Sequence, residues 1–501
     1  MNISIPPNYL KYITKSKILN FNKCENYFKL NLIQSQDGNK RKSPILYNLE
    51  NDRVKELARS LYGKLEILPK FNDVLEAFRE TQIKIDAKIS ISHPVLISKD
   101  LIASPDLLIV LEDGSLEIVE IVTSVNAKKD IEVFLSFYLL VSKELDLPVK
   151  KLTVIKINSN YILEESFDIQ NFFKFVDYTN KVENSTALVQ NTIESIRKIR
   201  DGVQDENSII HNICSNIKGC SFQSACFPDI KDGDLTTLRE SSNIINQLYD
   251  ANIFKLSDIP IENYSEDLTK KQIIQIQSNK EELEKYNINN LQSFLDRIKF
   301  PVYYLDFETI NPQIPFYNKT KAFQHVPFLY SLHIWKDIES EEPEHHDFIQ
   351  SNPNDPRPSI LKSLSELIQG EGTILCFNDF FEKRCIQESV HFLPEYSDWL
   401  ESIRGNFLDA AIPFKSLDYY SFKQKGSASL KDILPALTGA SHEHLDIQNG
   451  HSANLIYLKW IQSFSANNIP NGKVLEQLRE YCKMDTWALY LIHKKLLEIC
   501  K

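Results

Sequence analysis

The sequence contains no long apolar run: no stretch approaches the roughly 20 residues that a membrane-spanning helix requires. Its opening, MNISIPPNYLKYITKSKIL, has no apolar segment followed by a small-residue cleavage site, so we expect no secretory signal. Basic residues are not in excess either, because 57 Lys and Arg face 68 Asp and Glu for a formal charge of −11. That balance argues against a protein that coats nucleic acid by bulk electrostatics, although a local basic groove is compatible with it. These absences predict a soluble, cytoplasmic protein without a membrane partner.

Internal repeats and long low-complexity segments are absent, and glycine (13 residues) and methionine (2 residues) are scarce. Scarce glycine beside abundant Asn, Ile and Lys resembles the bias of an AT-rich genome, which concerns the source of the chain and not its mechanism. The chain does have length. Its 501 residues exceed what one hydrophobic core supports, and predict about two to four domains.

Three regions follow from the pattern of apolar and polar residues. Region 1–235 mixes helices with a hairpin, PDLLIVLEDGSLEIVEIV, in which Asp-Gly marks the turn. Region 236–295 is polar and rich in helix formers, as expected of a helical connector. Region 296–501 starts with an apolar strand and ends in a segment with helical periodicity. The predicted fold class is α/β, with two α/β domains joined by the connector.

The strand that opens the third region, VYYLDFETI, contains two carboxylates, Asp306 and Glu308. Residues two apart on a strand share a face, so the two acids project side by side. Burying an unpaired carboxylate costs several kcal/mol by rough estimate, which makes a divalent cation the natural partner. The alternative for an isolated Asp-x-Glu is one acid that caps a turn and one that is solvated.

Further acids follow along the third region. Tyr481 and Asp485 lie four residues apart in the final helical segment and therefore share a face. The segment TILCFNDFFEKRCI places Asn378 and Glu382 after an apolar strand, and GNFLDAAIPF places Asp409 after a short apolar run. Several acids in one region are what a metal-dependent site requires.

In this order, the segments resemble the DnaQ-like, or DEDD, exonuclease superfamily, whose fold is RNase H-like. That family carries Asp-x-Glu on its first strand, then Asn-x-x-Phe-Asp, then a final helix with His or Tyr-x-x-x-Asp. The resemblance covers about the last 200 residues. It departs in the middle motif, where Glu382 stands in place of Asp, so that Asp379 or Asp409 is an alternative ligand there.

The resemblance implies hydrolysis of phosphodiester bonds from a 3′ end by two Mg²⁺ or Mn²⁺ ions, about 4 Å apart in sites of this kind. Asp306 would bridge both ions, Glu308 and Asp485 would bind the ion that activates water, and Tyr481 would orient that water. The implied metal ligands are Asp306, Glu308, Glu382, Asp409 and Asp485.

Four of the eight cysteines form a second pattern. HNICSNIKGCSFQSACFP holds Cys214, Cys220 and Cys226 at even intervals, and Cys24 lies far upstream. In a cytosolic protein metal binding is the better expectation than disulfides, and paired zinc knuckles are missing. The arrangement resembles the iron–sulfur staple of RecB-family nucleases of the AddB and CRISPR-adaptation exonuclease type, which implies a 4Fe–4S cluster, with Zn²⁺ as the alternative. The remaining cysteines are expected to be small buried hydrophobes: Cys376, Cys385, Cys482 and Cys500.

Region 1–235 also resembles the PD-(D/E)XK core of that family, with Asp106 and Glu120 at the positions of its acids. It departs from the family in several ways. Val122 stands where a lysine follows the Glu, and Tyr138 alone remains of the Gln-x-x-x-Tyr element. The helix that usually carries a histidine offers Asp52 or Arg53, and Lys128 or Lys129 would have to supply the lysine. We therefore expect a degenerate nuclease domain kept for binding or assembly.

The whole chain resembles bacterial proteins that fuse an iron–sulfur RecB-like domain to a DnaQ-like one. The resulting expectation is a metal-dependent 3′–5′ exonuclease acting on single-stranded DNA or DNA ends, with a role in DNA repair or in defence against foreign DNA. A catalytically silent nucleic-acid-binding scaffold and an RNA exonuclease are the alternatives. Aromatic residues near the first motif are candidates for base stacking (Phe316, Tyr317 and Phe323), whereas Phe328 and Tyr330 are expected in the core.

Overall fold

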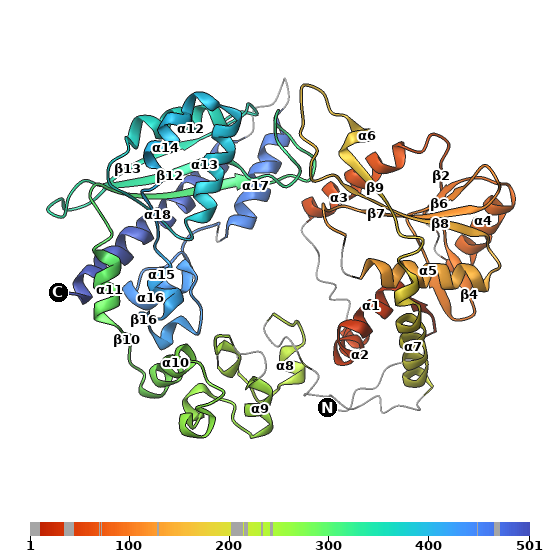
Figure 1. The fold of residues 1–501 in the computed structure, drawn as a ribbon, viewed down its shortest axis with the longest axis horizontal. Helices are drawn as coiled ribbons and strands as arrows, with labels where there is room; N and C mark the ends of the chain where they lie inside the picture. Colours follow the sequence, from red (N-terminus) through yellow and green to blue (C-terminus); the bar gives the residue numbers. More distant parts are fainter. Residues whose placement is uncertain are drawn as a thin grey trace. The chain divides into compact units, whose positions relative to one another are not determined.

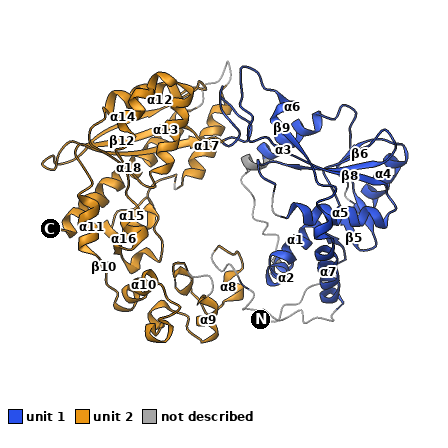
Figure 2. Ribbon diagram, in the orientation of Figure 1, with its two compact units in different colours: residues 1–214, 312–323 blue, residues 215–311, 324–501 orange. Residues whose placement is uncertain are grey.

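The computed structural model describes residues 11–34, 45–69, 71, 73–127, 130–201, 214, 219–231, 234–240, 244–447, 449–464 and 471–501. The chain divides into two compact units (Figure 2). Unit 1 comprises residues 1–214 and 312–323, and unit 2 comprises residues 215–311 and 324–501. Both units mix helices and strands, as the predicted α/β class requires. Within the described ranges, no helix is long and apolar enough to cross a bilayer.

Unit 1 is built on a six-stranded sheet in the order β2-β3-β6-β7-β8-β9 (Figure 1). The predicted hairpin is present: β6 and β7 pair antiparallel, and Gly114 in the turn has a φ of +82°. β8 then joins β7 in parallel, after a helical crossover. The strands are β2 (Glu66–Ile67), β3 (Ile91–Ser92), β6 (Leu107–Val110), β7 (Leu116–Val122), β8 (Val149–Ile157) and β9 (Phe173–Asp177).

A second, three-stranded sheet in unit 1 has the order β1-β5-β4. Its strands are β1 (Ile13–Thr14), β4 (Leu96–Ser98) and β5 (Leu101–Ala103). The helices of unit 1 are α1 (Lys15–Lys23), α2 (Glu25–Gln34), α3 (Ile45–Ser60), α4 (Val74–Asp86), α5 (Ile131–Glu144), α6 (Ile169–Phe172) and α7 (Glu183–Arg200). One core cluster joins α3, through Val54 and Ala58, to the apolar residues of β6, β7 and β8.

Residues 312–323 leave unit 2 and fold with unit 1. Thr320 O accepts from Leu163 N at 2.9 Å, Lys319 N donates to Leu163 O at 2.6 Å, and Phe323 packs against the core cluster of α3 and β6–β8. Tyr317 is buried, whereas Phe316 is 43% exposed. Of the three aromatic residues considered for base stacking, Phe316 alone is largely exposed. All three belong to unit 1 and not to the unit that contains Asp306.

Unit 2 contains a five-stranded mixed sheet in the order β13-β12-β11-β14-β15. The central strand β11 pairs antiparallel with β12 and parallel with β14. The strands are β11 (Val302–Ile310), β12 (Val326–Trp335), β13 (Glu344–Ile349), β14 (Thr373–Cys376) and β15 (Phe407–Asp409). Phe328 and Tyr330 on β12 are buried, as expected.

Helices cover both faces of this sheet (Figure 1). Leu305 and Phe307 of β11 pack with α12 (Arg357–Leu367), α13 (Phe380–Phe392) and α14 (Ser397–Ile403) on one face. Val302 and Tyr304 pack with α11 (Ile288–Leu295), α16 (Leu430–Thr438) and α18 (Lys473–Ile499) on the other. Asp306 and Glu308 alternate with Leu305 and Phe307 along β11, so they project from the face that α18 covers.

The remaining described elements of unit 2 are short helices, the two longer helices α10 and α17, and a two-stranded pairing of β10 with β16. The predicted 236–295 connector is indeed helical, and it lies within unit 2. Arg239 ties it to the rest of that unit by donating to the backbone carbonyls of Phe414, Gly426 and Ser427. The elements are α8 (Gln223–Cys226), η3 (Leu235–Thr237), α9 (Ile244–Asp250), η4 (Leu256–Asp258), η5 (Ile261–Tyr264), α10 (Lys270–Glu281), β10 (Lys285–Tyr286), η6 (Pro394–Tyr396), α15 (Ile412–Ser416), β16 (Tyr419–Tyr420), η7 (Phe422–Gln424) and α17 (Gly450–Gln462).

Candidate metal centre

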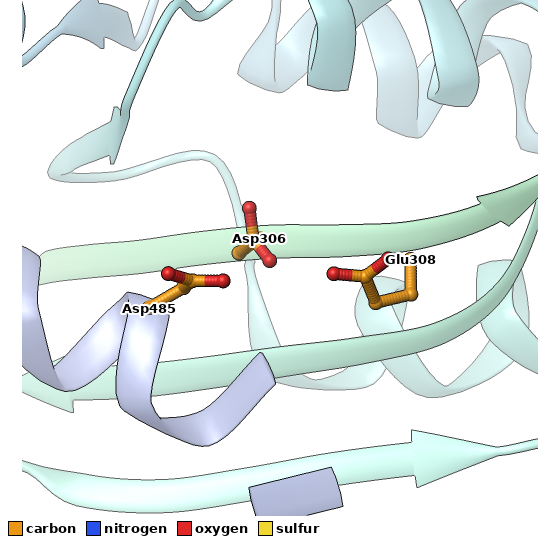
Figure 3. A group of neighbouring side chains, drawn as sticks. All are labelled: Asp306, Glu308 and Asp485. Carbon is orange, nitrogen blue, oxygen red and sulfur yellow. The ribbon is translucent and has the colours of Figure 1, made fainter. Parts of the chain in front are cut away.

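Strand β11 and helix α18 bring three carboxylates together in unit 2 (Figure 3). Ligand oxygens of Asp306, Glu308 and Asp485 all lie within 4.8 Å of one another. Among the residues that the structure describes, this is the one group of three or more possible metal ligands. We call these residues the acidic trio. The sequence analysis named all three residues as candidate ligands. The fold brings Asp485 of α18 to Asp306 and Glu308 of β11, although at least 177 positions separate the helix residue from the strand residues.

The local structure explains how the trio forms. Asp306 and Glu308 share a face because side chains alternate along β11, and the register with β12 shifts immediately after Glu308. On α18, Leu478, Cys482 and Leu489 are buried against the sheet, and the same face carries Tyr481 and Asp485. An amphipathic helix thus holds its polar residues above the acids of the strand.

Burial and mutual repulsion dominate the electrostatics of the trio. Glu308 and Asp485 are 6% and 7% exposed, and the carboxyl group of Asp306 lies in the interior although its residue is partly exposed. Burial, reinforced by Asp485, raises the pKa of Asp306 well above its usual range. Burial, Asp306 and Asp485 do the same to the pKa of Glu308. Asp306 and Glu308 therefore resist carrying negative charge together unless a cation is present.

Neighbouring side chains fix individual oxygens of the trio. The Cys482 thiol donates to Asp306 Oδ2 at 3.3 Å. His442, 6% exposed, places its Nε2 at 2.9 Å from Asp485 Oδ1. Each contact restricts one carboxylate and leaves its second oxygen for another partner. A carboxylate held in this way is a better ligand, because less ordering is needed when a cation binds.

Glu382, which the sequence analysis offered as the middle ligand, lies outside the trio, but the charge of Asp306 acts on its carboxyl group. It is 2% exposed on α13, and burial followed by the charge of Asp306 raises its pKa well above the usual range. Its Oε2 is buried and has no hydrogen-bond partner within the described part of the chain. A buried carboxylate oxygen without a partner is costly, and a bound cation would relieve that cost.

The two alternatives to Glu382 are engaged elsewhere. Asp409, at the end of β15, accepts backbone N–H groups of Asn378 and Ala411 at 2.8 Å each and pairs with Lys415 Nζ at 2.9 Å. Asp379 pairs with Lys383 Nζ at 2.5 Å. Their hydrogen bonds stabilise the turns around the middle motif. Asp409 and Asp379 are therefore each paired with a lysine, whereas Glu382 Oε2 has no hydrogen-bond partner among the described residues.

Tyr481 completes the set that the sequence indicated in unit 2. It is 4% exposed, and burial together with the charges of Asp485 and Glu308 raises its pKa, so the phenol keeps its proton. Lys431 Nζ donates to the Tyr481 hydroxyl at 3.1 Å. Sequence reasoning missed Lys431 and His442. The segments that hold them, SASLKDILPAL and GASHEHL, have no fixed spacing to the acids that would have linked them.

Unit 1 contains the second pair of predicted acids, Asp106 and Glu120, which we call the unit 1 acid pair. Asp106 Oδ1 accepts from Lys55 Nζ of α3 at 2.7 Å, and its Oδ2 accepts from the backbone N–H of Ile121 at 2.8 Å. Glu120 Oε1 accepts from Lys15 Nζ of α1 at 2.5 Å. Both acids are buried, at 8% and 7% exposure, and each has its own lysine.

The remaining predicted features of the unit 1 site are only partly visible. Tyr138 donates its hydroxyl to Glu120 Oε2 at 3.4 Å, so the tyrosine that the sequence analysis singled out contacts this acid. Helix α3, on which the sequence offered Asp52 or Arg53, contributes Lys55 to the unit 1 acid pair. The other two candidate lysines, at positions 128 and 129, lie outside the described residues.

The four cysteines of the predicted iron–sulfur cluster are divided between the units. Cys24 and Cys214 belong to unit 1, and Cys220 and Cys226 belong to unit 2. The cluster therefore remains a prediction. Three of the other cysteines, Cys376, Cys385 and Cys482, are buried as expected, whereas Cys500 is only partly buried.

Comparison with family models gives one match. A model described as a domain of unknown function (DUF2779) matches residues 303–429. The match includes Asp306, Glu308 and Glu382 and ends before Lys431 and Asp485. Comparison with curated proteins and with solved structures finds no match to the chain. The geometry of the acids therefore carries the functional argument.

Proposed function

We propose that unit 2 is a divalent-metal-dependent nuclease that hydrolyses phosphodiester bonds at the 3′ end of DNA. One observation carries this proposal: the acidic trio gathers three carboxylates within 4.8 Å at a mostly buried position. Such a group is costly unless it binds a cation, so its presence calls for a function. Hydrolysis of a phosphodiester is one reaction that metal ions held in this way carry out, because they polarise the phosphate and activate water.

The residues present fit Mg²⁺ or Mn²⁺. The trio offers only oxygen atoms, which these ions prefer over nitrogen and sulfur. Glu382 adds a buried Oε2 without a hydrogen-bond partner in the described chain. When bound, such ions polarise the phosphate and lower the pKa of an attacking water. Asp306, Glu308, Asp485 and Glu382 are the residues that would hold them.

The protein's own groups have separable roles in this proposal. Cys482 and His442 orient Asp306 and Asp485 through the contacts described above. Tyr481 keeps its hydroxyl proton and can donate a hydrogen bond to the attacking water or to a phosphate oxygen. The burial of Glu308, Glu382 and Tyr481 limits the water that reaches the acids, which strengthens every charge interaction at the centre.

DNA as substrate and 3′ polarity rest on the resemblance of the motif order to DnaQ-like exonucleases. RNA is the alternative substrate, because the chemistry of the trio does not involve the 2′-hydroxyl. A nucleic-acid-binding scaffold without catalysis is the alternative function. The Glu at position 382 and the lysine-paired acids of unit 1 favour that alternative. We propose region 1–235 as a nucleic-acid-binding module whose Cys24, Cys214, Cys220 and Cys226 would hold a 4Fe–4S cluster, and in which Asp106 and Glu120 have no hydrolytic role.

The test is degradation of a 5′-labelled single-stranded DNA by the full chain with Mn²⁺ or Mg²⁺, with an RNA of the same sequence in parallel. Asp306→Ala and Glu120→Ala are the matched variants, each removing one buried carboxylate from one unit. A ladder that shortens from the 3′ end and disappears only in Asp306→Ala supports the proposal. Loss of cleavage in Glu120→Ala alone would transfer the chemistry to unit 1, and no cleavage of either substrate would favour the scaffold.

A further inference from the structure

Unit 2 contains a pocket between α18 and β12. Its volume is about 610 Å³, a size typical of sites that bind small organic molecules. The half-buried side chains of Trp487 and Met484 on α18 provide apolar surface, and the buried His333 of β12 also belongs to the lining. Trp487 is held by ring contacts with Tyr490 and His333, at centroid distances of 4.9 and 5.5 Å. A fixed aromatic ring in a pocket is a surface on which a planar ligand can stack.

The hydrogen-bonding groups of this pocket are mainly acceptors. Three exposed carboxylates line it, against one lysine, Lys483, among the described residues of the lining. The carboxylates are those of Glu342, Asp446 and Glu480. An ionised carboxylate accepts hydrogen bonds and donates none. Three acids against one lysine also repel an anion, so a neutral ligand suits the pocket better than a phosphate group does.

His333 adds a further acceptor. Thr486 Oγ1 donates its one proton to the Lys483 carbonyl oxygen at 3.1 Å, so it accepts from His333 Nδ1 at 2.8 Å. Burial, followed by the nearby His345 and Lys483, lowers the pKa of His333 to about 3, so the ring is neutral near pH 7. A neutral imidazole with its proton on Nδ1 has a lone pair on Nε2. No described residue hydrogen-bonds Nε2, so this lone pair is left for a ligand.

The pocket adjoins the acidic trio. Ser331 lies directly opposite Asp306 in the register of β11 and β12, and His333 is two residues further along β12. Two residues of a strand span about 7 Å, which equals about two nucleotides of a stacked single strand. On α18, Met484 immediately precedes Asp485. A nucleic acid whose phosphate lies at the trio can therefore bring a neighbouring base to the pocket.

A nucleobase with an exocyclic amino group matches this lining. Its planar ring can stack on the indole of Trp487, as unpaired bases stack on aromatic side chains. Its amino group supplies the donors that the carboxylates and the His333 lone pair accept. Adenine and cytosine carry such a group, whereas thymine presents a carbonyl oxygen and a methyl group instead. The lining is therefore expected to distinguish among bases.

We propose that this pocket is a base-binding subsite of unit 2, which accepts an adenine or a cytosine of the substrate strand near the scissile phosphate and disfavours thymine. The inference rests on the proposed nuclease function, and it names the part of the substrate that unit 2 recognises. Neither the order of the sequence motifs nor the acids of the trio specify such a preference.

The experiment measures the binding of labelled dA, dC and dT homopolymers of equal length to the full chain in Ca²⁺. We expect the wild type to bind dA and dC about 10-fold more tightly than dT, which is the discrimination that one good base contact provides. Trp487→Ala is expected to weaken the binding of all three oligonucleotides by about 10-fold, because one stacked base is lost.

Two triple variants make the same change of charge at exposed acids of unit 2. The pocket variant is Glu342→Ala, Asp446→Ala, Glu480→Ala, and the control outside the lining is Glu339→Ala, Glu341→Ala, Glu476→Ala. The pocket variant is expected to bind dA, dC and dT almost alike, because it lacks the carboxylates that accept from the amino group. The control is expected to keep the wild-type preference, since it changes only the overall charge. All six acids are exposed, so this pair stays informative even if Trp487→Ala does not fold.

Equal binding of the three oligonucleotides by the wild type would overturn the inference, and so would a wild-type preference in the pocket variant. Failure of the proposed function is a different result. In that case the base preference in binding remains, but the wild type shortens neither DNA nor RNA in Mn²⁺.

Discussion

Both units bury neighbouring carboxylates, but the groups that surround these carboxylates differ between the two units. In unit 1, Asp106 and Glu120 are buried and each is paired with a lysine from a helix. In unit 2, the acidic trio is buried to a similar degree, but the groups that contact Asp306 and Asp485 are the Cys482 thiol and the His442 imidazole. In unit 1, two lysines match the two acids in charge. In unit 2, no lysine forms an ion pair with a carboxylate of the trio among the described residues.

This difference separates acids whose charge the protein itself compensates from acids whose charge it leaves uncompensated. Acids alone do not mark a metal centre, because lysines can take the place of the cation and keep the acids buried. Breaking such a pair leaves an uncompensated buried charge, so an acid with its own lysine has a structural role that needs no metal. A centre that still needs a metal is recognised by acids that lack their own cations.

The largest effect is expected from Glu382→Gln. This variant tests whether Glu382 binds the metal together with the three acids of the trio. If Oε2 of Glu382 is a metal ligand, its loss lowers cleavage by about 10³-fold, comparable with the loss of a strong electrostatic contact in the transition state. The rate of 3′ shortening measures this. Asp409→Asn is the control and is expected to cost less, since Asp409 is engaged by Lys415 and two backbone N–H groups. The reverse ranking would make Asp409 the ligand.

The unit 1 site is broken by removing its cations. The double variant Lys15→Met, Lys55→Met leaves two buried carboxylates unpaired, and we expect unit 1 to lose about 3 kcal/mol of stability. Part of that loss is regained in Mn²⁺, because the acids now resemble the trio. Melting temperatures with and without Mn²⁺ measure both effects.

Lys150→Met serves as the control for that double variant, because Lys150 is 64% exposed and pairs with an exposed Asp113. It is expected to leave the melting temperature unchanged. If the double variant melts like the wild type and ignores Mn²⁺, the lysines are not what compensates the unit 1 acid pair.

In unit 2, His442 contacts Asp485, whereas in unit 1 the buried acids are contacted by lysines. His442→Ala is expected to weaken Mn²⁺ binding by roughly 10- to 100-fold, the usual cost of losing a partner of a metal ligand. Titration calorimetry on the full chain measures this affinity. His391→Ala, at an exposed position of α13, is the control. Equal affinities in the two variants would remove His442 from the site.

Neutralising one acid in each unit should change stability in opposite directions. Without divalent metal, Asp306→Asn relieves repulsion within the trio and is expected to stabilise the protein by about 1 kcal/mol. Asp106→Asn leaves Lys55 without its partner and is expected to destabilise unit 1 by a similar amount or more. Denaturant unfolding in EDTA measures both. Changes of the same sign would show that the two sites do not differ in charge balance.

The smallest effect concerns Asp100, a third compensated acid in unit 1. Hydrogen bonds from Arg197 and then Arg200 hold the pKa of Asp100 at about 2, below the usual 3.8. The ion pairs therefore stabilise the folded state fully above about pH 4, and this stability is lost as the pH falls toward 2. Asp100→Asn is expected to cost about 1 kcal/mol at pH 7, after allowance for solvent screening. Its penalty should shrink at pH 2.5, and a pH-independent penalty would contradict the assignment.

Local sequence patterns predicted the parts of this structure that depend on local geometry. Strand alternation placed Asp306 and Glu308 on one face, helical spacing paired Tyr481 with Asp485, and the Asp-Gly turn predicted the β6–β7 hairpin. The nuclease activity and the iron–sulfur cluster that the family resemblance implied stay predictions.

Long-range partners could not be predicted from the sequence. Lys15 and Lys55 reach acids 105 and 51 residues away, and His442 reaches Asp485 across 43 residues. No spacing rule connects such positions, because the intervening folds decide which side chains meet. The same reasoning explains why the aromatic residues around 316–323 did not join the trio: their segment packs on the core of unit 1.

That segment also determines how the protein can be divided. The chain enters unit 1 for residues 312–323 and returns to unit 2 between β11 and β12, so the strand that holds Asp306 is followed by a piece of the other unit. A single proteolytic cut near residue 214 would leave this piece attached to unit 2 and still docked in unit 1 through its backbone bonds to Leu163. Expressing residues 215–501 alone would expose Phe323 and Ile314, which otherwise pack in an apolar core. A truncated protein that aggregates would therefore be uninformative about catalysis, and the intact chain is the right starting material for enzymology.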